Sequence, residues 1–154
     1  MSKDDCFGSS ALKYGEAVEV YKELPLDEFK NIVSSFRKSG IVTENKVVLI
    51  VKFGADWCRP CKLIKPICDK LFNEMPDNVI CFDIDIDETM DLYMALKKYK
   101  MVSGVPCILA YFLHPNRSDT EWYIPNDSVI GGNPNHVEAF FARCKKHAIN
   151  LSIN

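Results

Sequence analysis

The sequence lacks a long apolar run: no stretch approaches the roughly 20 apolar residues that a membrane-spanning helix needs. Its opening residues, Met1–Asp5, are polar and do not form the apolar centre of a secretory signal. Neither end carries a lipid-attachment motif or an ER-retention tail. These absences argue against a membrane protein, and we therefore expect no membrane partner and a cytoplasmic location.

An excess of either charge is also missing. The chain has 19 lysines and arginines against 21 aspartates and glutamates, which gives a formal net charge of −2. A nucleic-acid-binding surface normally needs a basic excess, so we expect no nucleic-acid partner. The 154 residues show no internal repeat, and their 47% hydrophobic content suits one soluble domain. We expect this domain to span residues 16–150, after a flexible N-terminal arm over residues 1–15.

Metal-ligand clusters are scarce as well. Of seven cysteines, only Cys58 and Cys61 form a CxxC pair, and the three histidines are scattered. A structural zinc site needs four ligands, and covalent haem attachment needs a histidine where Lys62 stands, so we expect no metal and no haem. The odd cysteine count also differs from the even count of a secreted disulfide framework. We therefore expect the other five cysteines to be free thiols.

The pattern of apolar residues predicts alternating strands and helices. The expected strands cover residues 16–21, 47–53, 79–87 and 107–113, with an irregular or edge strand within 121–130. The expected helices begin at Pro25, after Cys58, at Met90 and after Pro134, and the first three end near Ser39, Met75 and Tyr99. The inward residues expected in the second and third helices are Leu63, Ile64, Ile67, Leu71 and Phe72, and Leu92, Tyr93, Leu96 and Tyr99.

This order of elements, β-α-β-α-β-α-β-β-α, predicts an α/β fold. Alternating βα units favour parallel pairing, and the two adjacent strands near the end favour an antiparallel edge. We therefore expect a mixed, mostly parallel central sheet that is flanked by helices, with the N-terminal extension outside it.

The CxxC pair stands where a strand gives way to a helix. The continuous apolar run Val47–Val51 is typical of a buried central strand, and the predicted helix follows Cys58. The first N–H groups of a helix are unpaired and its dipole is positive there, so a thiolate is favoured over a thiol. A spacing of i, i+3 puts Cys58 and Cys61 on one side of the first turn, close enough to bridge. This arrangement predicts a redox-active disulfide that exchanges electrons with other disulfides.

In these features the chain resembles the thioredoxin family. The resemblance rests on the segment Phe53–Lys62 (FGADWCRPCK), on Pro66, on the strand Phe82–Asp85 and on the tripeptide Gly104–Pro106. It covers roughly residues 16–147 and implies a thioredoxin fold in which Cys58 is the attacking thiol and Cys61 the resolving thiol. It also implies a cis peptide bond between Val105 and Pro106, in a loop that docks the substrate beside the reactive sulfur.

Lys52 and Arg59 depart from the family pattern. Lys52 stands where the family usually has a buried aspartate beneath the resolving cysteine, and Asp83 occupies the matching place on the neighbouring strand. A lone buried lysine costs free energy, so we predict a Lys52–Asp83 ion pair under Cys61; the alternative is that Lys52 reaches solvent. Arg59 stands where glycine is usual. Its fixed charge would either favour the thiolate and make the pair more oxidising, or only shape the choice of partner.

Other residues are expected to frame the site. Trp57 and Pro60 are part of the cysteine motif, and we expect Trp57 to form a rim that contacts partners. Gly131 and Gly132 are predicted to line the same groove, because a missing side chain lets a partner approach. The alternative is a turn that leads into the last helix, with Asn133 as its N-cap.

Cys107 is a further cysteine near the expected site, since it directly follows Pro106, where the family usually has threonine. It is either a third redox thiol or a small buried residue of the core, and we favour the second interpretation. Cys68, Cys81 and Cys144 lie on apolar stripes and are expected in the core as well.

The leading interpretation is a dithiol–disulfide oxidoreductase that reduces disulfides in protein substrates and serves cell redox homeostasis. The resemblance implies that an NADPH-linked disulfide reductase recycles its own disulfide, and the exchange itself needs no cofactor. We expect a monomer. Two alternatives are also open: an oxidase or isomerase, suggested by Arg59, and a thioredoxin-fold protein-interaction module whose dithiol is incidental.

Overall fold

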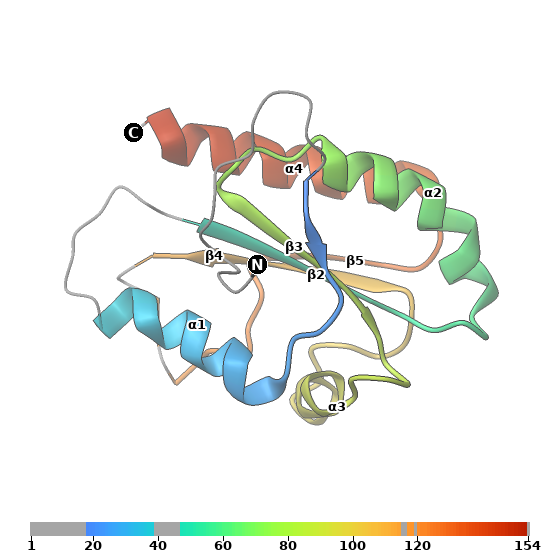
Figure 1. The fold of residues 1–154 in the computed structure, drawn as a ribbon, viewed down its shortest axis with the longest axis horizontal. Helices are drawn as coiled ribbons and strands as arrows, with labels where there is room; N and C mark the ends of the chain where they lie inside the picture. Colours follow the sequence, from blue (N-terminus) through green and yellow to red (C-terminus); the bar gives the residue numbers. More distant parts are fainter. Residues whose placement is uncertain (1–17, 39–46, 115–116, 119, 154) are drawn as a thin grey trace, which may run out of the picture.

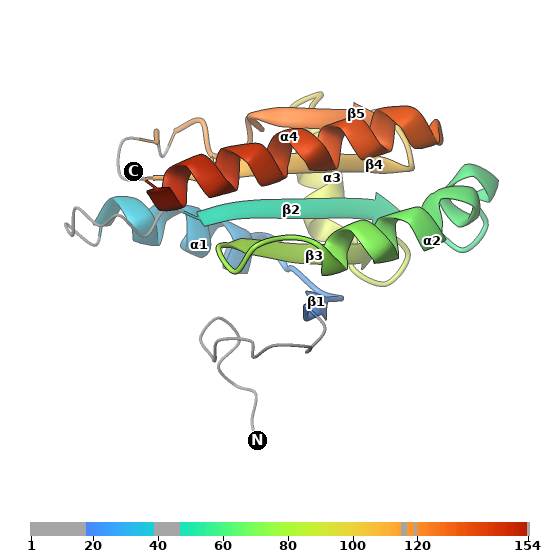
Figure 2. The same cartoon turned by 90° about the horizontal axis from the view of Figure 1, so that it is seen from above.

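A five-stranded sheet with helices on both faces forms the described part of this computed structural model (Figure 1, Figure 2). The structure describes residues 18–38, 47–114, 117–118 and 120–153. Its elements are β1 Val20–Tyr21, α1 Leu26–Lys38, β2 Val47–Gly54, α2 Arg59–Asn73, β3 Val79–Asp85, α3 Asp91–Lys98, β4 Cys107–Leu113, β5 Asp127–Ile130 and α4 Pro134–Ile153. This order confirms the predicted α/β fold class. The arm predicted over residues 1–15 lies outside the described residues.

The sheet is mixed, as predicted, in the strand order β1-β3-β2-β4-β5. β1, β3 and β2 run parallel, whereas β4 is antiparallel to β2, and β5 to β4. Four of the five strands therefore run in one direction, as predicted for a mostly parallel sheet, and only β4 runs the other way. β4 is reversed because α3 has only 8 residues. At about 1.5 Å per residue, it is too short to return the chain along the length of β3, so β4 starts at the edge where β3 ends.

Alternation of side chains along the strands divides the core into two layers. In β2, Leu49 and Val51 lie in the same apolar cluster as residues of α1 and α3. Val48 and Ile50 lie in the cluster that contains residues of α2 and α4. Figure 1 shows these two pairs of helices on opposite sides of the sheet. Lys52 continues the second series, and the fold therefore turns its side chain toward α2.

Several element boundaries differ from the sequence prediction. β1 begins only at Val20, and β3 ends at Asp85, whose Oδ1 accepts the N–H of Asp87 at 2.9 Å in a tight turn. The strand expected within residues 121–130 is confined to β5, because Pro125 has no N–H to donate to a strand ladder. β5 lies at the edge of the sheet, as predicted. None of the described helices is long and apolar enough to cross a membrane.

Two residues predicted for the core are exposed, Leu63 at 65% and Tyr99 at 44%. Leu63 follows the buried Cys61 by two residues, so it lies about 200° around α2 from it, on the solvent side. Tyr99 comes just after α3 has ended, and its ring stacks on Tyr123 with the centroids 3.9 Å apart. Apolar spacing alone therefore places these two residues wrongly.

Candidate active site

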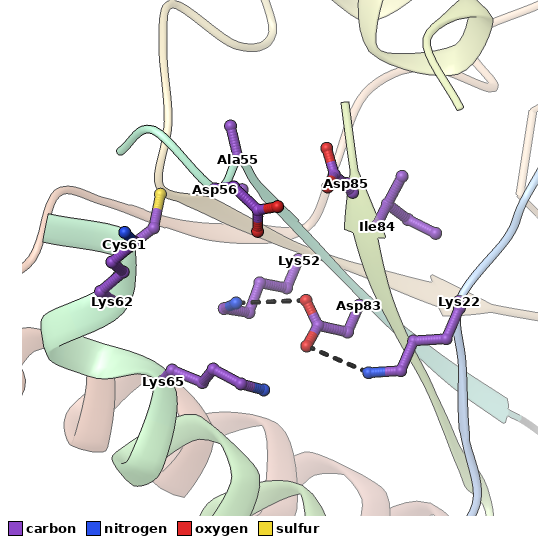
Figure 3. Close-up of a pocket in the computed structure, with 11 residues that line it drawn as sticks. Lys22, Lys52, Ala55, Asp56, Cys61, Lys62, Lys65, Asp83, Ile84 and Asp85 are labelled. Atoms are coloured by element: carbon purple, nitrogen blue, oxygen red, sulfur yellow. Dashed lines mark hydrogen bonds and ion pairs between the residues drawn. The ribbon is translucent and has the colours of Figure 1, made fainter. Parts of the chain in front are cut away.

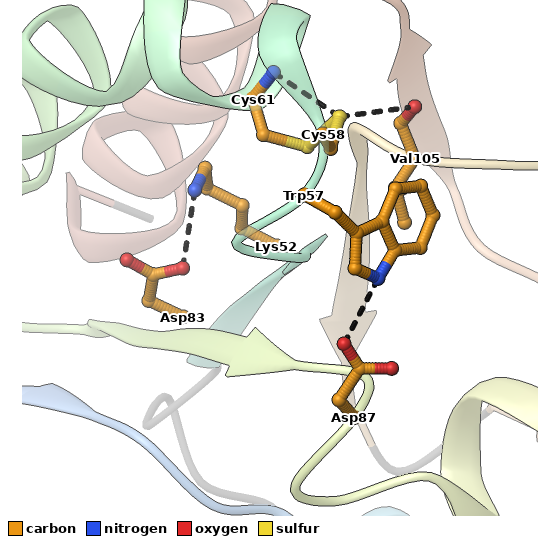
Figure 4. The surroundings of a disulfide bond; sticks show 7 residues. All are labelled: Lys52, Trp57, Cys58, Cys61, Asp83, Asp87 and Val105. Carbon is orange, nitrogen blue, oxygen red and sulfur yellow. Dashed lines mark hydrogen bonds and ion pairs between the residues drawn. A yellow bond between two sulfur atoms is a disulfide. The ribbon is translucent and has the colours of Figure 1, made fainter.

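The cysteine pair lies at the N-terminus of α2. Cys58 is the N-cap of this helix, and a disulfide joins it to Cys61, with the two Cα atoms 5.2 Å apart (Figure 4). The backbone N–H of Cys61 points at Sγ of Cys58 over 3.2 Å. Pro60 lies in the first turn, where a missing N–H leaves no helical hydrogen bond unmade. After reduction, the N–H of Cys61 and the helix dipole would both stabilise negative charge on the sulfur of Cys58.

A loop from the other side of the site approaches Cys58 closely. The peptide bond between Val105 and Pro106 is cis, and the carbonyl oxygen of Val105 lies 3.6 Å from Sγ of Cys58. The carbonyl oxygen of Pro106 accepts the N–H of Gly131 at 2.9 Å, which ties this loop to the end of β5. Cys58 and Cys61 are each only 5% exposed. Cys58 and Cys61 therefore offer little surface to a partner, and the Val105 loop lies next to the sulfur of Cys58.

Trp57 stands at the rim of an apolar groove beside this loop. It is 67% exposed, and its indole N–H donates to Oδ2 of Asp87 over 2.9 Å. A cavity of about 300 Å³ lies between Trp57 and α3. Its lining includes Ile86, Met90, Tyr93, Met94 and Val105. Met90 and Met94 are half exposed, so the groove offers flexible apolar side chains to a partner.

Gly132 lies against Pro60, next to the disulfide. A Cβ added to Gly132 would stand 2.9 Å from Cβ of Pro60, too close for a side chain unless the backbone shifts. Gly131 has a φ of +96°, which favours glycine. Asn133 then caps α4, since its Oδ1 accepts the N–H of Asn135 at 2.9 Å. The segment is thus both a wall beside the cysteine motif and the turn into the last helix.

A buried ion pair lies behind Cys61, on the α2 side of the sheet. Nζ of Lys52 is 3.1 Å from Oδ1 of Asp83, and Lys52 is only 4% exposed, so the alternative in which Lys52 reaches solvent is wrong. Nζ of Lys22, at the surface, lies 3.6 Å from the other carboxylate oxygen. A cavity of about 190 Å³ borders the ion pair and Cys61, and Figure 3 shows Lys52 extended toward Asp83 within it. The sequence predicted this contact but not the cavity.

Arg59, between the two cysteines, is exposed. Solvent screens a fixed charge at the surface, so its effect on nearly buried sulfurs is weak. This exposure favours the interpretation in which Arg59 contacts partners over the one in which it makes the pair strongly oxidising.

The other described cysteines are buried in the core. Cys68, Cys81, Cys107 and Cys144 are all 0% exposed. Burial raises the pKa of Cys107 to about 12, that of Cys144 to about 12 and that of Cys68 to about 11. A thiol that keeps its proton at neutral pH is a poor nucleophile, which supports the core interpretation of Cys107. Among the residues that the structure describes, no three histidine, cysteine or acidic side chains are grouped so that they could hold a metal ion.

Two features of the site were not predicted from the sequence. One is the pair Met90 and Met94, whose i, i+4 spacing outside the apolar set of α3 was the available signal. The other is the hydrogen bond from Trp57 to Asp87, which depends on the turn after Asp85. That turn falls in a segment expected to be strand.

Comparisons with known proteins agree with this geometry. The profile of the family described as Thioredoxin matches residues 23–122. Thioredoxin-T from Drosophila melanogaster is 42% identical over 52 residues, which cover 34% of this chain and 32% of that protein. Thioredoxin-1 from Schizosaccharomyces pombe is 29% identical over 110 residues, which cover 71% of this chain and 92% of that protein. The matched segments cover only 34%, 39% and 47% of three other relatives, so this chain matches a part of the length of those proteins.

A solved structure supports the fold. Thioredoxin from Trypanosoma brucei brucei superposes with a TM-score of 0.57 at 20% identity, over 88% of this chain and 99% of that chain. At this level of identity the likeness shows the fold alone, and it confirms the thioredoxin fold that the motifs implied.

Proposed function

We propose, since this chain belongs to the thioredoxin family, that its Cys58–Cys61 pair reduces disulfide bonds in other proteins. Membership supports a thiol–disulfide oxidoreductase in general. The observation that carries the finer proposal is the position of Cys58, at the N-cap of α2 and 3.6 Å from the carbonyl oxygen of Val105. The sulfur that the helix best stabilises as a thiolate is therefore the one beside a loop where an extended chain can dock.

The reaction proceeds through a mixed disulfide. The Cys58 thiolate attacks one sulfur of the target, so that a Cys58–target bond forms while the target disulfide breaks. The displaced target sulfur leaves as a thiolate and takes a proton from water. Cys61, as a thiolate, then attacks Cys58, which forms the intramolecular disulfide and releases the second target thiolate. The target gains two electrons and two protons, the dithiol is oxidised, and no cofactor takes part.

The groove beside Trp57 supports a protein as the substrate. Trp57, Met90 and Met94 present exposed apolar surface within one cavity that also reaches Val105. An extended peptide segment along this loop would bring its disulfide to Cys58 while its apolar side chains contact the groove. A small disulfide would leave most of that surface unused.

Reduction of insulin tests the proposal. The reduced protein should cleave the interchain disulfides of insulin, and a Cys58→Ser variant should lose this activity. The matched control is Cys144→Ala, which removes a core thiol and should keep the activity. If the folded wild-type protein does not reduce insulin or another protein disulfide, the proposal is wrong and the protein-interaction module takes its place.

We also propose an NADPH-linked disulfide reductase as the recycling partner, because every turnover leaves the Cys58–Cys61 pair oxidised. Consumption of NADPH, in an insulin assay that contains a thioredoxin reductase in catalytic amount, measures this step. A monomer in the cytoplasm is the simplest setting for it. The four cysteines that are free and buried in the described part of the chain suit a reducing compartment, and cell fractionation together with size-exclusion chromatography tests both points.

A further inference from the structure

Lys52 is the only charged side chain that is buried in the described part of the chain. Such a group is costly to bury, so its place beside the resolving cysteine calls for an explanation. On the basis of the proposed function, we propose that Lys52 is a positioning residue that stabilises the thiolate form of Cys61 and so speeds release of the target protein.

The geometry places Lys52 and Cys61 around one small space. A Cβ on Gly54 would stand 3.5 Å from Sγ of Cys61 and 3.8 Å from Nζ of Lys52. Because Gly54 has no side chain, this space between the sulfur and the ammonium group stays open. Both groups also border the cavity of about 190 Å³ that Figure 3 shows. A sulfur anion and an ammonium group on the two sides of this space attract each other, since Cys61 and Lys52 are both nearly buried.

Other charged groups face the same cavity from the neighbouring elements. They are Lys22, Asp56, Lys62, Lys65, Asp83 and Asp85. Lys65 is exposed, and its pKa is raised by a hydrogen bond to Asp69, 3.2 Å away on the same helix. Lys22 is 66% exposed at its side chain. Solvent therefore screens these cations, whereas Lys52 acts on Cys61 with little screening.

A cation beneath Cys61 acts differently from a carboxylate. An ammonium group cannot take the proton of the Cys61 thiol, but it lowers the free energy of the thiolate once the proton has left. Asp83 partners the ammonium group of Lys52 at 3.1 Å, and a buried charge without such a partner would be costly. The proton leaves to water, for which the adjoining cavity has room.

The effects of the Lys52 and Asp83 charges on Cys61 can be told apart by comparing three proteins. They are the wild type, Lys52→Met, and the double variant Lys52→Met/Asp83→Leu. In a Cys58→Ser background, the pH dependence of Cys61 alkylation, followed by mass spectrometry of its peptide, reports the pKa of Cys61. We expect this pKa to rise in the order wild type, double variant, Lys52→Met, because the single variant leaves the Asp83 carboxylate near the thiolate. The shift in Lys52→Met should be about one unit or more.

The matched control is Lys65→Met, which removes an exposed cation from the same cavity wall and should shift the pKa much less. With Cys58 present, Lys52→Met should also slow release of a preformed Cys58 mixed disulfide by about threefold or more at neutral pH. A one-unit rise in pKa lowers the thiolate fraction about tenfold, and the higher nucleophilicity of the more basic thiolate offsets part of this loss. Rapid quenching and mass spectrometry measure this release.

An unchanged alkylation profile in Lys52→Met would overturn the proposal. The proposal would also be overturned if the double variant released the target protein more slowly than Lys52→Met. That result would mean that Asp83 transfers the proton of Cys61. If Lys52→Met fails to fold, the double variant decides alone, because it removes both charges of the ion pair and its Cys61 pKa must still exceed that of the wild type. A wild type that is inactive on insulin, yet shows the predicted shifts, would overturn only the proposed function.

Discussion

Cys58 and Cys107 both lie near Val105, yet their surroundings differ. Sγ of Cys58 is 3.6 Å from the carbonyl oxygen of Val105, and Cys107 comes two residues after Val105 in the chain. Sγ of Cys58 faces the N–H of Cys61 at the N-terminus of α2. Cys107 lies in an apolar cluster with the strands and with α1 and α3, where burial raises its pKa to about 12.

Exposure does not explain why the redox pair is expected to be reactive and Cys107 is not, since Cys58 and Cys61 are each only 5% exposed and Cys107 is 0% exposed. What differs is the direction of the nearby dipoles and charges. Cys58 faces one backbone donor, the N–H of Cys61, and Cys61 adjoins the space in front of Lys52, whereas Cys107 has apolar neighbours. A cysteine in this fold becomes reactive through the groups aimed at its sulfur, and a few per cent of exposed area then provides access.

The largest expected effect is a difference between the alkylation rates of Cys58 and Cys107 in the reduced protein. At about pH 7, Cys58 should react at least about a thousandfold faster than Cys107, because the thiolate fraction falls tenfold for each unit of raised pKa. The reaction of Cys107 should still rise with pH after that of Cys58 has levelled off, since the folded protein keeps the Cys107 proton until the pH nears 12. A time course by mass spectrometry measures both rates. Comparable labelling of Cys107 in the folded protein would restore it as a third redox thiol.

Serine substitutions at the two redox positions test the division of labour within the pair. Cys58→Ser and Cys61→Ser should each lower insulin turnover at least about a hundredfold, because each removes a covalent step. Only Cys61→Ser should accumulate mixed disulfides with target proteins, since Cys58 can still attack but nothing resolves the product. Non-reducing gels and mass spectrometry detect these species. Equal accumulation in both variants would show that the two thiols are interchangeable.

Local signals in the sequence explain why much of the fold and the site could be predicted. The order of elements follows from apolar periodicity, and the CxxC position follows from the strand that precedes it. The Lys52–Asp83 contact was also predictable, because β2 and β3 pair in a parallel register that sets these two residues side by side. Their pairing needs only the neighbouring strand.

The remaining features depend on contacts between distant segments. The direction of β4 depends on the length of α3, and the side on which Leu63 lies depends on how α2 packs on the sheet. The groove needs Trp57 and α3 to come together, and the cavity behind Cys61 needs Gly54 to leave space between two side chains. No spacing within one segment encodes these arrangements.

A substitution at Gly132 should hinder the approach of a substrate to Cys58 without changing either cysteine. In Gly132→Val, the new Cβ would stand 2.9 Å from Cβ of Pro60, so the chain must shift beside the cysteine motif. We expect KM for insulin to rise about tenfold, as for the loss of about 1.4 kcal/mol of binding. The control is Lys145→Ala, an exposed position on α4 that lines neither the groove beside Trp57 nor the cavity behind Cys61. A normal KM in Gly132→Val, with an unchanged melting temperature, would mean that this wall does not guide the substrate.

The smallest expected effect concerns the hydrogen bond between the indole N–H of Trp57 and Oδ2 of Asp87. Trp57 is 67% exposed and contacts a groove rather than a core, so this bond is what fixes the ring at the rim. Trp57→Phe and Asp87→Ala should each raise KM for insulin a few-fold, because a ring that is not held must be ordered again when a partner binds.

A double-mutant cycle separates this orienting role from two independent contacts. If the bond holds the ring, Trp57→Phe/Asp87→Ala should raise KM no further than either single change, with a coupling energy of about 1 kcal/mol. If Asp87 contacts the substrate by itself, the two effects add and the coupling energy is near zero. The cycle thus carries the comparison of Cys58 with Cys107 to the outer edge of the site. Dipoles and charges around the sulfurs set their reactivity, and the hydrogen bond from Trp57 to Asp87 positions the surface that a partner contacts.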